Sequence, residues 1–322
     1  MVMSFTFLSD NGSSNQVECS TPTWGYSILA GQVIGYCLLF VPVLDVTINI
    51  ITLAYTIRAP KLKANTRLFL CSLMICNTFS GVFVLPVKLF GMITVELKIP
   101  GQLIVLLCDL GNSFDGMLRT SSIFHLSALA FDEYISVCRP FRRSYWLNRK
   151  FNTILFVGCW IIPAILYFCF IPPKIHIKGI EQQMECLFQR TKMCQFISNK
   201  PYAIATTGIC YIVPTAFILL CNACTKSSVE KREQMFYKLV QINTKKRSFN
   251  RRHFGTKLAR IVILLSYSCI LCWFPFYLIT FIDPLTSYRV PTYMWLLVSW
   301  IGYTNSIILP IIYLKLTRVL TF

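Results

Sequence analysis

Charged residues are scarce in this chain of 322 residues. Asp, Glu, Lys and Arg together make up 14% of it and apolar residues make up 55%, and the mean hydropathy is +0.59. In an ordinary soluble domain about a quarter of the residues are charged. The composition therefore excludes a disordered chain, disfavours a water-soluble globule and predicts a polytopic membrane protein.

Histidine is scarce too, and the residue types that build metal or nucleophile sites do not cluster. The three histidines, His125, His176 and His253, are scattered, and the pair Cys221 and Cys224 has no second pair to complete a zinc site. We therefore expect no catalytic residue, no metal site, no cofactor and no enzyme. The sequence also lacks an inverted repeat and a file of polar residues along several helices, which counts against a transporter or a channel.

Long apolar runs, in contrast, are abundant. Each run is long enough for the roughly 20 residues that cross a bilayer core as a helix. Seven runs predict an all-α membrane protein, a seven-transmembrane helix bundle with its two ends on opposite sides of the membrane. The runs cover residues 27–57, 68–87, 99–131, 151–173, 201–225, 261–282 and 290–314.

Acidic residues are few, 13 against 31 Lys and Arg, and the basic residues are unevenly placed. Of the 31, 22 fall between the first and second, third and fourth, and fifth and sixth runs or after the seventh, and none falls in residues 1–24. Since cytoplasmic loops carry the excess of Lys and Arg, the amino terminus is expected outside and the tail inside. The basic excess then reflects membrane topology and contact with anionic lipid rather than nucleic-acid binding.

The expected organisation is one domain in the plasma membrane. Residues 1–24 form an extracellular segment, 25–315 the seven-helix domain and 316–322 a short cytoplasmic tail. Residues 226–255 are expected to prolong the fifth helix into the cytoplasm, because their apolar residues recur near helical spacing. Prolines are expected to kink the helices and to open room for a pocket or a hinge. They are Pro86, Pro163, Pro214, Pro275 and Pro310.

Four of the 15 cysteines are placed to face the oxidising exterior. A bridge from Cys108 to Cys194 would tie the outer end of the third helix to the second outer loop. Cys19 and Cys186 form a second candidate pair, which would hold the amino-terminal segment over the bundle. Asn11 begins an Asn-Gly-Ser tripeptide on the same side and is a candidate glycosylation site.

The third run contains two acidic residues, Asp115 and Asp132. Their 17-residue separation spans about 26 Å of helix, nearly the thickness of a bilayer core, so one acid is expected near each membrane face. An ionisable group inside a membrane span is a functional candidate by default.

Several segments read together resemble the amine branch of the rhodopsin-like G-protein-coupled receptors. The resemblance is to type-4 serotonin receptors and to trace-amine-associated receptors, which share the SIFHL and DP signatures. NKPYAI and RVPTYMW lean toward the serotonin type, whereas CWFPF and two cysteines in one outer loop lean toward the trace-amine type. The segments are SSIFHL (121–126), GCWIIP (158–163), NKPYAI (199–204), CWFPF (272–276), FIDP (281–284) and WIGYTNS (300–306).

The resemblance implies a small amine ligand, with Asp115 holding its ammonium group by a charge-assisted hydrogen bond. Trp273, Phe276 and Tyr277 would pack the ligand ring and stabilise its cation. The alternative is that the carboxylate serves only the structure and the aromatics are ordinary core. Further wall residues implied by the resemblance are Thr206, Thr207 and Cys210 on the fifth helix and Trp300 and Tyr303 on the seventh.

Arg119 departs from the resembling families, which carry a small hydroxyl residue at its position. It lies four residues after Asp115 on the same helix face, and residues at this spacing meet. An unpaired arginine in mid-membrane costs on the order of 3 kcal/mol, so Asp115 is its expected partner, neither charge having another evident one. This argues against ordinary monoamine binding and leaves a zwitterionic or acidic ligand as the alternative.

The cytoplasmic motif Asp132-Glu133-Tyr134 has a negative charge where the resembling families have a positive one. Glu133 stands where the family has the arginine that engages the heterotrimeric G protein, and Gly255 stands where the sixth helix has the partner acid. Glu133 would instead meet Arg251, Arg252 or Lys257, and coupling is expected to be weak. Pro310 and Tyr313 keep the family pattern. Leu309 replaces its asparagine, and Asn77 replaces the sodium-binding aspartate, so sodium regulation is expected to be lost.

Two functions therefore compete. The first is a ligand-activated receptor that signals through a G protein, with weakened coupling. The second is a receptor-fold protein that no longer couples normally and acts as a decoy or as a partner of another receptor, or is the product of a decaying gene. The departures at Arg119, Glu133, Asn77 and Leu309 favour the second, and the pocket motifs favour the first.

Overall fold

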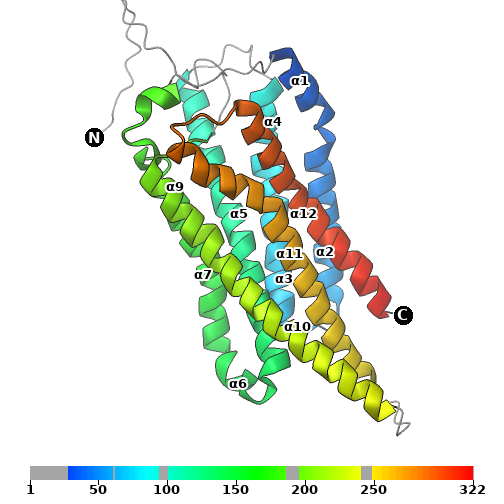
Figure 1. Cartoon of the computed structure of the whole chain (residues 1–322). Helices are drawn as coiled ribbons and strands as arrows, with labels where there is room; N and C mark the ends of the chain where they lie inside the picture. Colours follow the sequence, from blue (N-terminus) through cyan, green and yellow to red (C-terminus); the bar gives the residue numbers. More distant parts are fainter. Residues whose placement is uncertain (1–27, 61, 94–100, 186–195, 241–248, 322) are drawn as a thin grey trace, which may run out of the picture.

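The computed structural model describes residues 28–60, 62–93, 101–185, 196–240 and 249–321, and within these residues every regular element is helical. Seven long helical segments run roughly side by side as one bundle, as predicted (Figure 1). Their elements are α1 (Ile28–Cys37) with α2 (Phe40–Arg58); α3 (Ala64–Phe79), η1 (Ser80–Val84) and α4 (Leu85–Ile93); α5 (Gly101–Cys138); α7 (Arg149–Phe168); α9 (Lys200–Thr207), η4 (Gly208–Ile212) and α10 (Val213–Val240); α11 (Phe249–Leu285); and α12 (Thr292–Thr321).

Six of these segments are long and apolar enough to cross a membrane. The seventh, α5, has the length, but it carries Asp109, Asp115, Arg119, Asp132 and Glu133 and is therefore less apolar. Short elements connect the spans near their ends: η2 (Pro140–Arg142) and α6 (Arg143–Trp146) after α5, and η3 (Ile175–Ile177) after α7.

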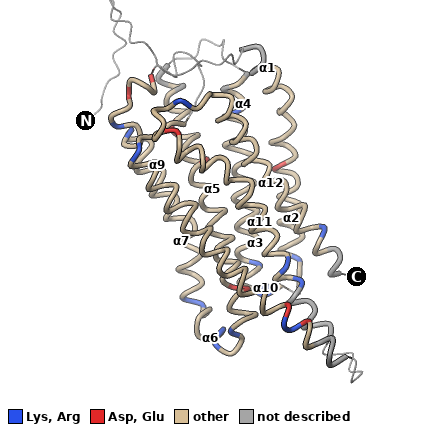
Figure 2. The backbone as a smooth tube through the Cα atoms, in the orientation of Figure 1, with Lys and Arg blue, Asp and Glu red and all other residues tan. Residues whose placement is uncertain are grey.

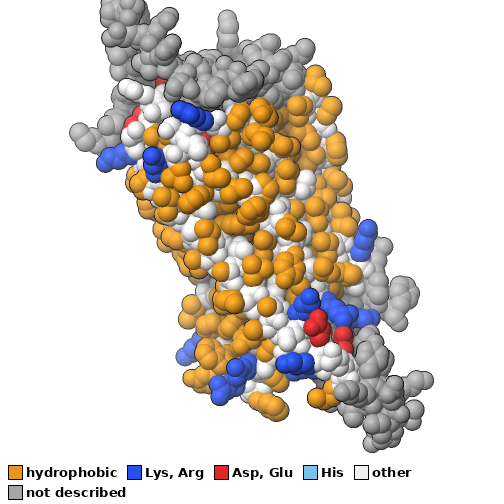
Figure 3. Space-filling view, viewed as in Figure 1, with side chains coloured by type: hydrophobic (Ala, Val, Ile, Leu, Met, Phe, Trp, Pro, Cys, Tyr) orange, Lys and Arg blue, Asp and Glu red, His pale blue; other side chains and the backbone are white. Residues whose placement is uncertain are grey.

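The surface of the bundle is apolar, as expected for a surface that faces lipid. Ile154, Leu220 and Leu271 are 71%, 67% and 69% exposed. Hydrophobic side chains cover most of the middle of the visible face, and Lys and Arg lie toward its ends (Figure 3). At the lower end, Lys and Arg gather near α6 and the lower part of α10 (Figure 2). Contiguous exposed apolar surface of this extent marks a membrane-facing protein.

The helix α5 is the central element of the bundle. It packs against α3, α7, α10 and α11, so its polar side chains point at other helices rather than at lipid. Asp115, Arg119, His125, Asp132 and Glu133 are all buried. Buried charges inside a bundle are kept only where partners or a ligand offset their desolvation, so α5 is where functional groups are expected.

The helices α5, α3 and α7 are tied together by His125. Its Nδ1 donates to the carbonyl oxygen of Ser121 at 2.6 Å, so its Nε2 accepts from the Ser72 hydroxyl at 2.8 Å. Ser72 in turn accepts from Trp160 Nε1 at 3.0 Å. The SSIFHL and GCWIIP segments therefore meet in a fully paired core network, which assigns His125 a structural role.

Two of the predicted proline kinks take the form of single π-helical turns. The turn at Ser80–Val84 comes just before Pro86, and the turn at Gly208–Ile212 comes just before Pro214. Proline has no N–H to donate to the preceding turn, and a π-helical turn accommodates the missing bond. Pro163, Pro275 and Pro310 instead lie inside continuous α-helices.

The fifth helix is prolonged beyond residue 225, as predicted, and α10 continues to Val240. The prediction was wrong for residues 249–255, because Phe249 begins α11 and these residues belong to the sixth helix. The extension lies beside the inner part of α11 (Figure 1). Glu233 of α10 accepts from Arg260 of α11 at 2.7 Å. This ion pair joins the fifth and sixth helices at their inner ends, where the family-type acid at residue 255 is missing.

Candidate functional site

The centre of the candidate site is the pair of Asp115 and Arg119 on α5. Arg119 Nη2 lies 3.6 Å from Asp115 Oδ2, so the predicted ion pair is confirmed. Only 7% of Asp115 and 8% of Arg119 is exposed. The two residues are one helical turn apart, and this is why their side chains meet. The residue predicted to anchor an amine is thus already paired with a cation of its own chain.

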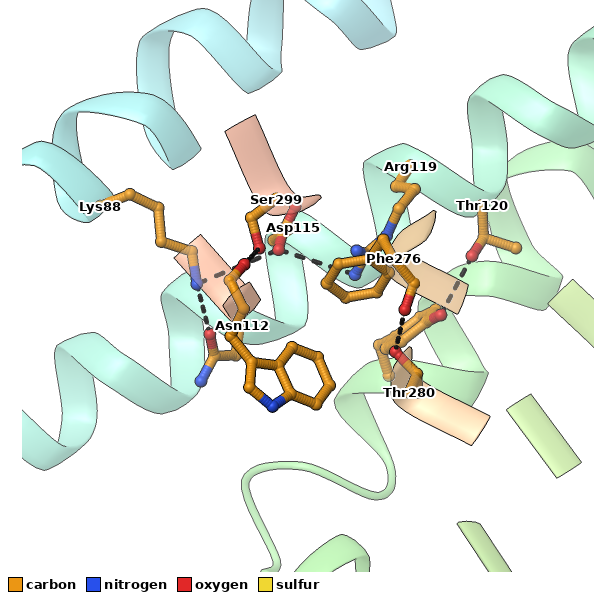
Figure 4. Close-up of polar contacts among 10 residues, drawn as sticks. Lys88, Asn112, Asp115, Arg119, Thr120, Phe276, Thr280 and Ser299 are labelled. Atoms are coloured by element: carbon orange, nitrogen blue, oxygen red, sulfur yellow. Dashed lines mark hydrogen bonds and ion pairs between the residues drawn. The ribbon is translucent and has the colours of Figure 1, made fainter. Parts of the chain in front are cut away.

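A second cation reaches the same carboxylate, which the sequence reasoning missed. Lys88 Nζ on α4 lies 4.0 Å from Asp115 Oδ2 and donates to Asn112 Oδ1 at 2.6 Å (Figure 4). The expectation that Asp115 and Arg119 have no other evident partner was therefore wrong. A signal was present, because Lys88 is the one charged residue in the apolar stretch Leu85–Ile93, and such a lysine seeks an interior partner.

Three aromatic rings of α11 surround the Arg119 guanidinium. Its central carbon lies 4.0 Å from the Phe276 ring centre, 4.9 Å from that of Trp273 and 5.7 Å from that of Tyr277. A cation within about 6 Å of a ring is attracted by the ring's quadrupole. The structure brings the predicted carboxylate and the predicted aromatics together, but Arg119 occupies the position expected for a ligand ammonium.

The seventh helix closes the site on another side. Tyr303 packs edge-on against Trp273 at 5.9 Å and against Trp300 at 5.6 Å. Trp295 of the same helix packs against Phe276 at 5.8 Å. The predicted aromatic residues of α11 and α12 thus form one continuous set of rings, and the Trp295 contribution was not predicted.

The three residues predicted on the fifth helix differ in what their side chains do. Thr206 donates its hydroxyl to the Tyr202 carbonyl oxygen at 2.7 Å, a bond within its own helix. The buried Thr207 hydroxyl has no hydrogen-bond partner among the described residues, and Cys210 is fully buried. Thr206 is thus already engaged, whereas Thr207 has a hydroxyl to offer; a ligand contact by any of the three stays a prediction.

The outer end of the site is shaped by Asp283 of the FIDP segment. Its Oδ1 accepts from the Val290 backbone N–H at 3.0 Å, and its Oδ2 accepts from Trp295 Nε1 at 3.3 Å. Asp283 therefore fixes the connection between α11 and α12 and the orientation of Trp295.

At the cytoplasmic end, Asp132 is held by neighbours. It accepts from the Thr66 hydroxyl at 2.6 Å and pairs with Arg143 of α6 at 3.5 Å. Glu133 is 2% exposed, and its Oε1 has no hydrogen-bond partner in the part of the chain that the structure describes. Glu133 makes no ion pair with any described side chain. The described side chains include that of Lys257, so the predicted pairing with Lys257 is not formed. The side chains of Arg251 and Arg252, like the surroundings of Gly255, lie outside the described ones.

The other predicted signalling residues, Tyr134, Pro310 and Tyr313, lie in or against the core. Tyr134 lies near Phe131, with ring centres 6.5 Å apart. Tyr313 is 1% exposed and meets Tyr55 edge-on at 6.4 Å, and its hydroxyl has no partner among the described residues. Pro310 and Leu309 are buried beside it.

A second acid that the sequence reasoning passed over lies on α2. Asp45 is fully buried, and its Oδ1 accepts from Asn49 Nδ2 at 2.8 Å, while its Oδ2 has no partner among the described residues. Asn49 also donates to the Ser306 carbonyl oxygen at 2.9 Å and accepts from Asn77 at 3.2 Å. Residue 77 is thus not an acid, but through Asn49 it is linked to an acid on the neighbouring helix α2.

Cys108 is disulfide-bonded. The other eleven cysteines of the described residues are free, so its partner lies outside them. Cys19, Cys186, Cys194 and Asn11 all fall in that part of the chain. The specific bridge to Cys194, the second bridge and the glycosylation site therefore stay predictions.

Comparison with known proteins agrees with this geometry. The family model of the seven-transmembrane receptors of the rhodopsin family matches residues 48–313. The human 5-hydroxytryptamine receptor 4 is 28% identical over 80% of this chain and 69% of its own length. The octopamine receptor beta-2R of Drosophila melanogaster is 22% identical over 88% and 59%. The mouse trace amine-associated receptor 1 is 25% identical over 65% and 63%.

The family match covers most of the chain and all seven helical segments at least in part. The bundle, the apolar exterior and the buried charges on α5 fit that match. The chain therefore belongs to the rhodopsin family of seven-transmembrane receptors and is a multi-pass receptor of the plasma membrane rather than an enzyme.

Proposed function

We propose that this protein is an amine-branch receptor that binds a small ligand between α4, α5, α11 and α12, with Asp115 at the centre of the site. The single observation that supports this best is the buried carboxylate beside the ring set of Trp273, Phe276 and Tyr303. A carboxylate and aromatic faces in a dry site are what an ammonium group requires. The relatives' names, which include serotonin, octopamine and trace-amine receptors, point the same way.

The site binds simple monoamines weakly. A ligand ammonium has to compete with Arg119, which already pairs with Asp115 and stacks on Phe276. Displacing Arg119 without a substitute leaves a buried guanidinium without a counter-charge, and breaking a buried ion pair in this way costs about 3–5 kcal/mol. The proposal therefore includes a ligand that gives Arg119 something in return.

The partner inside the cell is a heterotrimeric G protein, and coupling to it is weak. Glu133 takes the place of the arginine that the resembling receptors present, and it is buried. An acid there offers no cation to the G protein. The apolar exterior contacts membrane lipid.

The test is a second-messenger assay over a panel of amines and amino acids, with three chains expressed to equal surface levels. The chains are the natural one, Arg119→Thr and Glu133→Arg. We expect amine responses to rise in Arg119→Thr and overall output to rise in Glu133→Arg. Silence of both variants toward every panel member, with normal surface expression, would contradict the proposal.

A second candidate function is a receptor-fold protein that does not couple and instead acts as a decoy or as a partner of another receptor. The burial of Glu133 without an ion pair among the described side chains favours it. Under this alternative a panel ligand still binds the natural chain, but no G protein is activated unless residue 133 is changed.

A further inference from the structure

Two cations, the buried Arg119 and the partly buried Lys88, meet at one oxygen atom of the buried Asp115. Asp115 Oδ2 faces Arg119 Nη2 at 3.6 Å and Lys88 Nζ at 4.0 Å (Figure 4). Both distances exceed the 2.7–3.2 Å of an N–H···O hydrogen bond. One carboxylate thus stands between two cations and forms a hydrogen bond of normal length with neither. The group as it stands carries a net charge of +1.

The guanidinium of Arg119 is also short of acceptors. Its Nε and Nη1 have no hydrogen-bond partner among the described residues, although Arg119 is only 8% exposed. Aromatic faces attract a cation, but they do not replace acceptors for its N–H groups. A buried donor without an acceptor is unfavourable, so the N–H groups of Arg119 in the ligand-free site would be stabilised by oxygen atoms that accept from them.

We propose that the natural ligand carries a carboxylate in addition to its amine, and that this carboxylate binds between Lys88 and Arg119 while the ammonium takes Asp115. The inference rests on the proposed function and names the ligand class: a zwitterion of the α-amino acid type with an aromatic body. Guanidinium groups bind carboxylates with two parallel hydrogen bonds, and this would use the unpaired N–H groups of Arg119.

Charge separates a zwitterion from a simple amine. A simple amine raises the net charge of this group from +1 to +2, whereas a zwitterion leaves it at +1: Asp115 then faces the ligand ammonium, and Lys88 and Arg119 share the ligand carboxylate. When the ammonium takes Asp115, the ligand carboxylate replaces Asp115 as the partner of Arg119. Only a ligand with both groups frees Asp115 without leaving a buried cation unpaired.

Lys88 marks the approach to the site. Its side chain is 19% exposed, against 9% for Asp115 and 6% for Arg119. Asn112 holds the ammonium group of Lys88 at 2.6 Å, so this lysine is positioned rather than free to extend away. A ligand carboxylate therefore meets Lys88 first and Arg119 deeper in.

The aromatic part of the proposed ligand is inferred from the aromatic side chains around the charged group. Phe276, Trp273 and Trp295 are each 5–6% exposed and lie beside the charged group. Ring faces and edges at this depth pack a flat apolar group better than an aliphatic or polar chain.

The experiment measures binding to the purified full chain in lipid nanodiscs by ligand-induced shift of the melting temperature. Three matched probe sets separate the two charges: phenylalanine, tyrosine and tryptophan; their amines, phenethylamine, tyramine and tryptamine; and their deaminated acids, the corresponding 3-arylpropionates. We expect the best amino acid to bind at least tenfold more tightly than its amine, and the acids to bind as well.

Lys88→Met should weaken amino-acid and arylpropionate binding about tenfold and tighten amine binding, because one cation fewer competes for Asp115, while Lys88→Arg keeps carboxylate binding. Lys174→Met is the matched control, because Lys174 is another outer lysine, paired with Asp109 instead. Binding in this control should equal that of the natural chain.

Three results would overturn the inference: amines that bind as tightly as the amino acids, carboxylate probes that do not bind, or a Lys88→Met chain with unchanged carboxylate binding. Because the assay needs no G protein, it separates the two proposals. Carboxylate binding without any signal would support the zwitterionic ligand and count against signalling. Amine responses without carboxylate binding would support the signalling amine receptor and overturn the zwitterionic ligand.

Discussion

The guanidinium carbon of Arg119 lies 4.0 Å from the centre of the Phe276 ring, so a cation of the chain itself occupies the aromatic face that an amine would use. The same guanidinium holds the carboxylate of Asp115 at 3.6 Å. Removing one side chain should therefore open both halves of an amine site at once.

Arg119→Thr should raise the affinity for simple aryl-ethylamines by about tenfold or more, because the ammonium no longer competes with a buried cation. Adding Asp115→Ala in that background should abolish the gain, because the anchor is lost. Binding of a radiolabelled amine to membranes measures both effects. Undetectable amine binding by Arg119→Thr, at normal surface expression, would mean that the rest of the site does not fit an amine.

Glu133→Arg should raise agonist-independent signalling, because it gives the G protein a cation that no acid at residue 255 restrains. Adding Gly255→Glu should lower that output again by rebuilding an ion pair between the third and sixth helices. Basal second messenger, normalised to surface expression, is compared for the three chains. If the natural chain already couples as strongly as Glu133→Arg, another surface carries the contact.

Asp45→Asn should stabilise the receptor by about 1–3 kcal/mol. The carboxylate of Asp45 is fully buried and one of its oxygens has no partner among the described residues; an amide of the same shape removes the desolvation of a charge. The melting temperature in detergent should rise. As the matched control, Asn49→Ala should lower it, since it removes the bond to the Ser306 carbonyl. A lower melting temperature for Asp45→Asn would show that the charge itself is needed.

His176 should make the outer loop sensitive to acid. Burial lowers the pKa of this imidazole from 6.5 to about 4, with a smaller contribution from Lys174. The unfolded loop then binds a proton before the folded one, so stability is complete above pH 6.5 and is lost as the pH falls toward 4, by about 3 kcal/mol at most.

Melting temperature against pH measures this effect, and His176→Phe is the control, because it keeps the ring that stacks on Phe196 at 5.6 Å. The control should flatten the profile between pH 6.5 and 4. Identical profiles for the two chains would assign the acid sensitivity to other groups.

Cys108 should be found bonded to Cys194 in protein taken from the cell surface. The disulfide at Cys108 is present in the structure, and the partner was inferred from its place in the second outer loop. Peptide mapping without reduction identifies the partner. A peptide that links Cys108 to Cys186 or Cys19 would replace this pairing.

The fold and the pair at the centre of the site could be predicted from the sequence, since both depend on local spacing. Apolar runs give the helices, and a four-residue step gives the contact between Asp115 and Arg119. Lys88 could not be placed in the same way, because its partners Asn112 and Asp115 lie on another helix. Asp45 bonds to Asn49 of its own helix, and only the further bonds of Asn49, to Ser306 and Asn77, cross to other helices. A single charge in an apolar run indicates that it has a partner inside the bundle. Only the packing of the helices shows which residue that partner is.

The π-helical turn at Ser80–Val84 changes the rotational position of the residues that follow it on the second span. One extra residue in a helix rotates the residues beyond it by about 100°. The direction in which Lys88 points is thus determined by the residue count of a turn that contributes none of the three charged side chains. Deleting one residue from that turn would swing the lysine away from Asp115 without changing any side chain of the site.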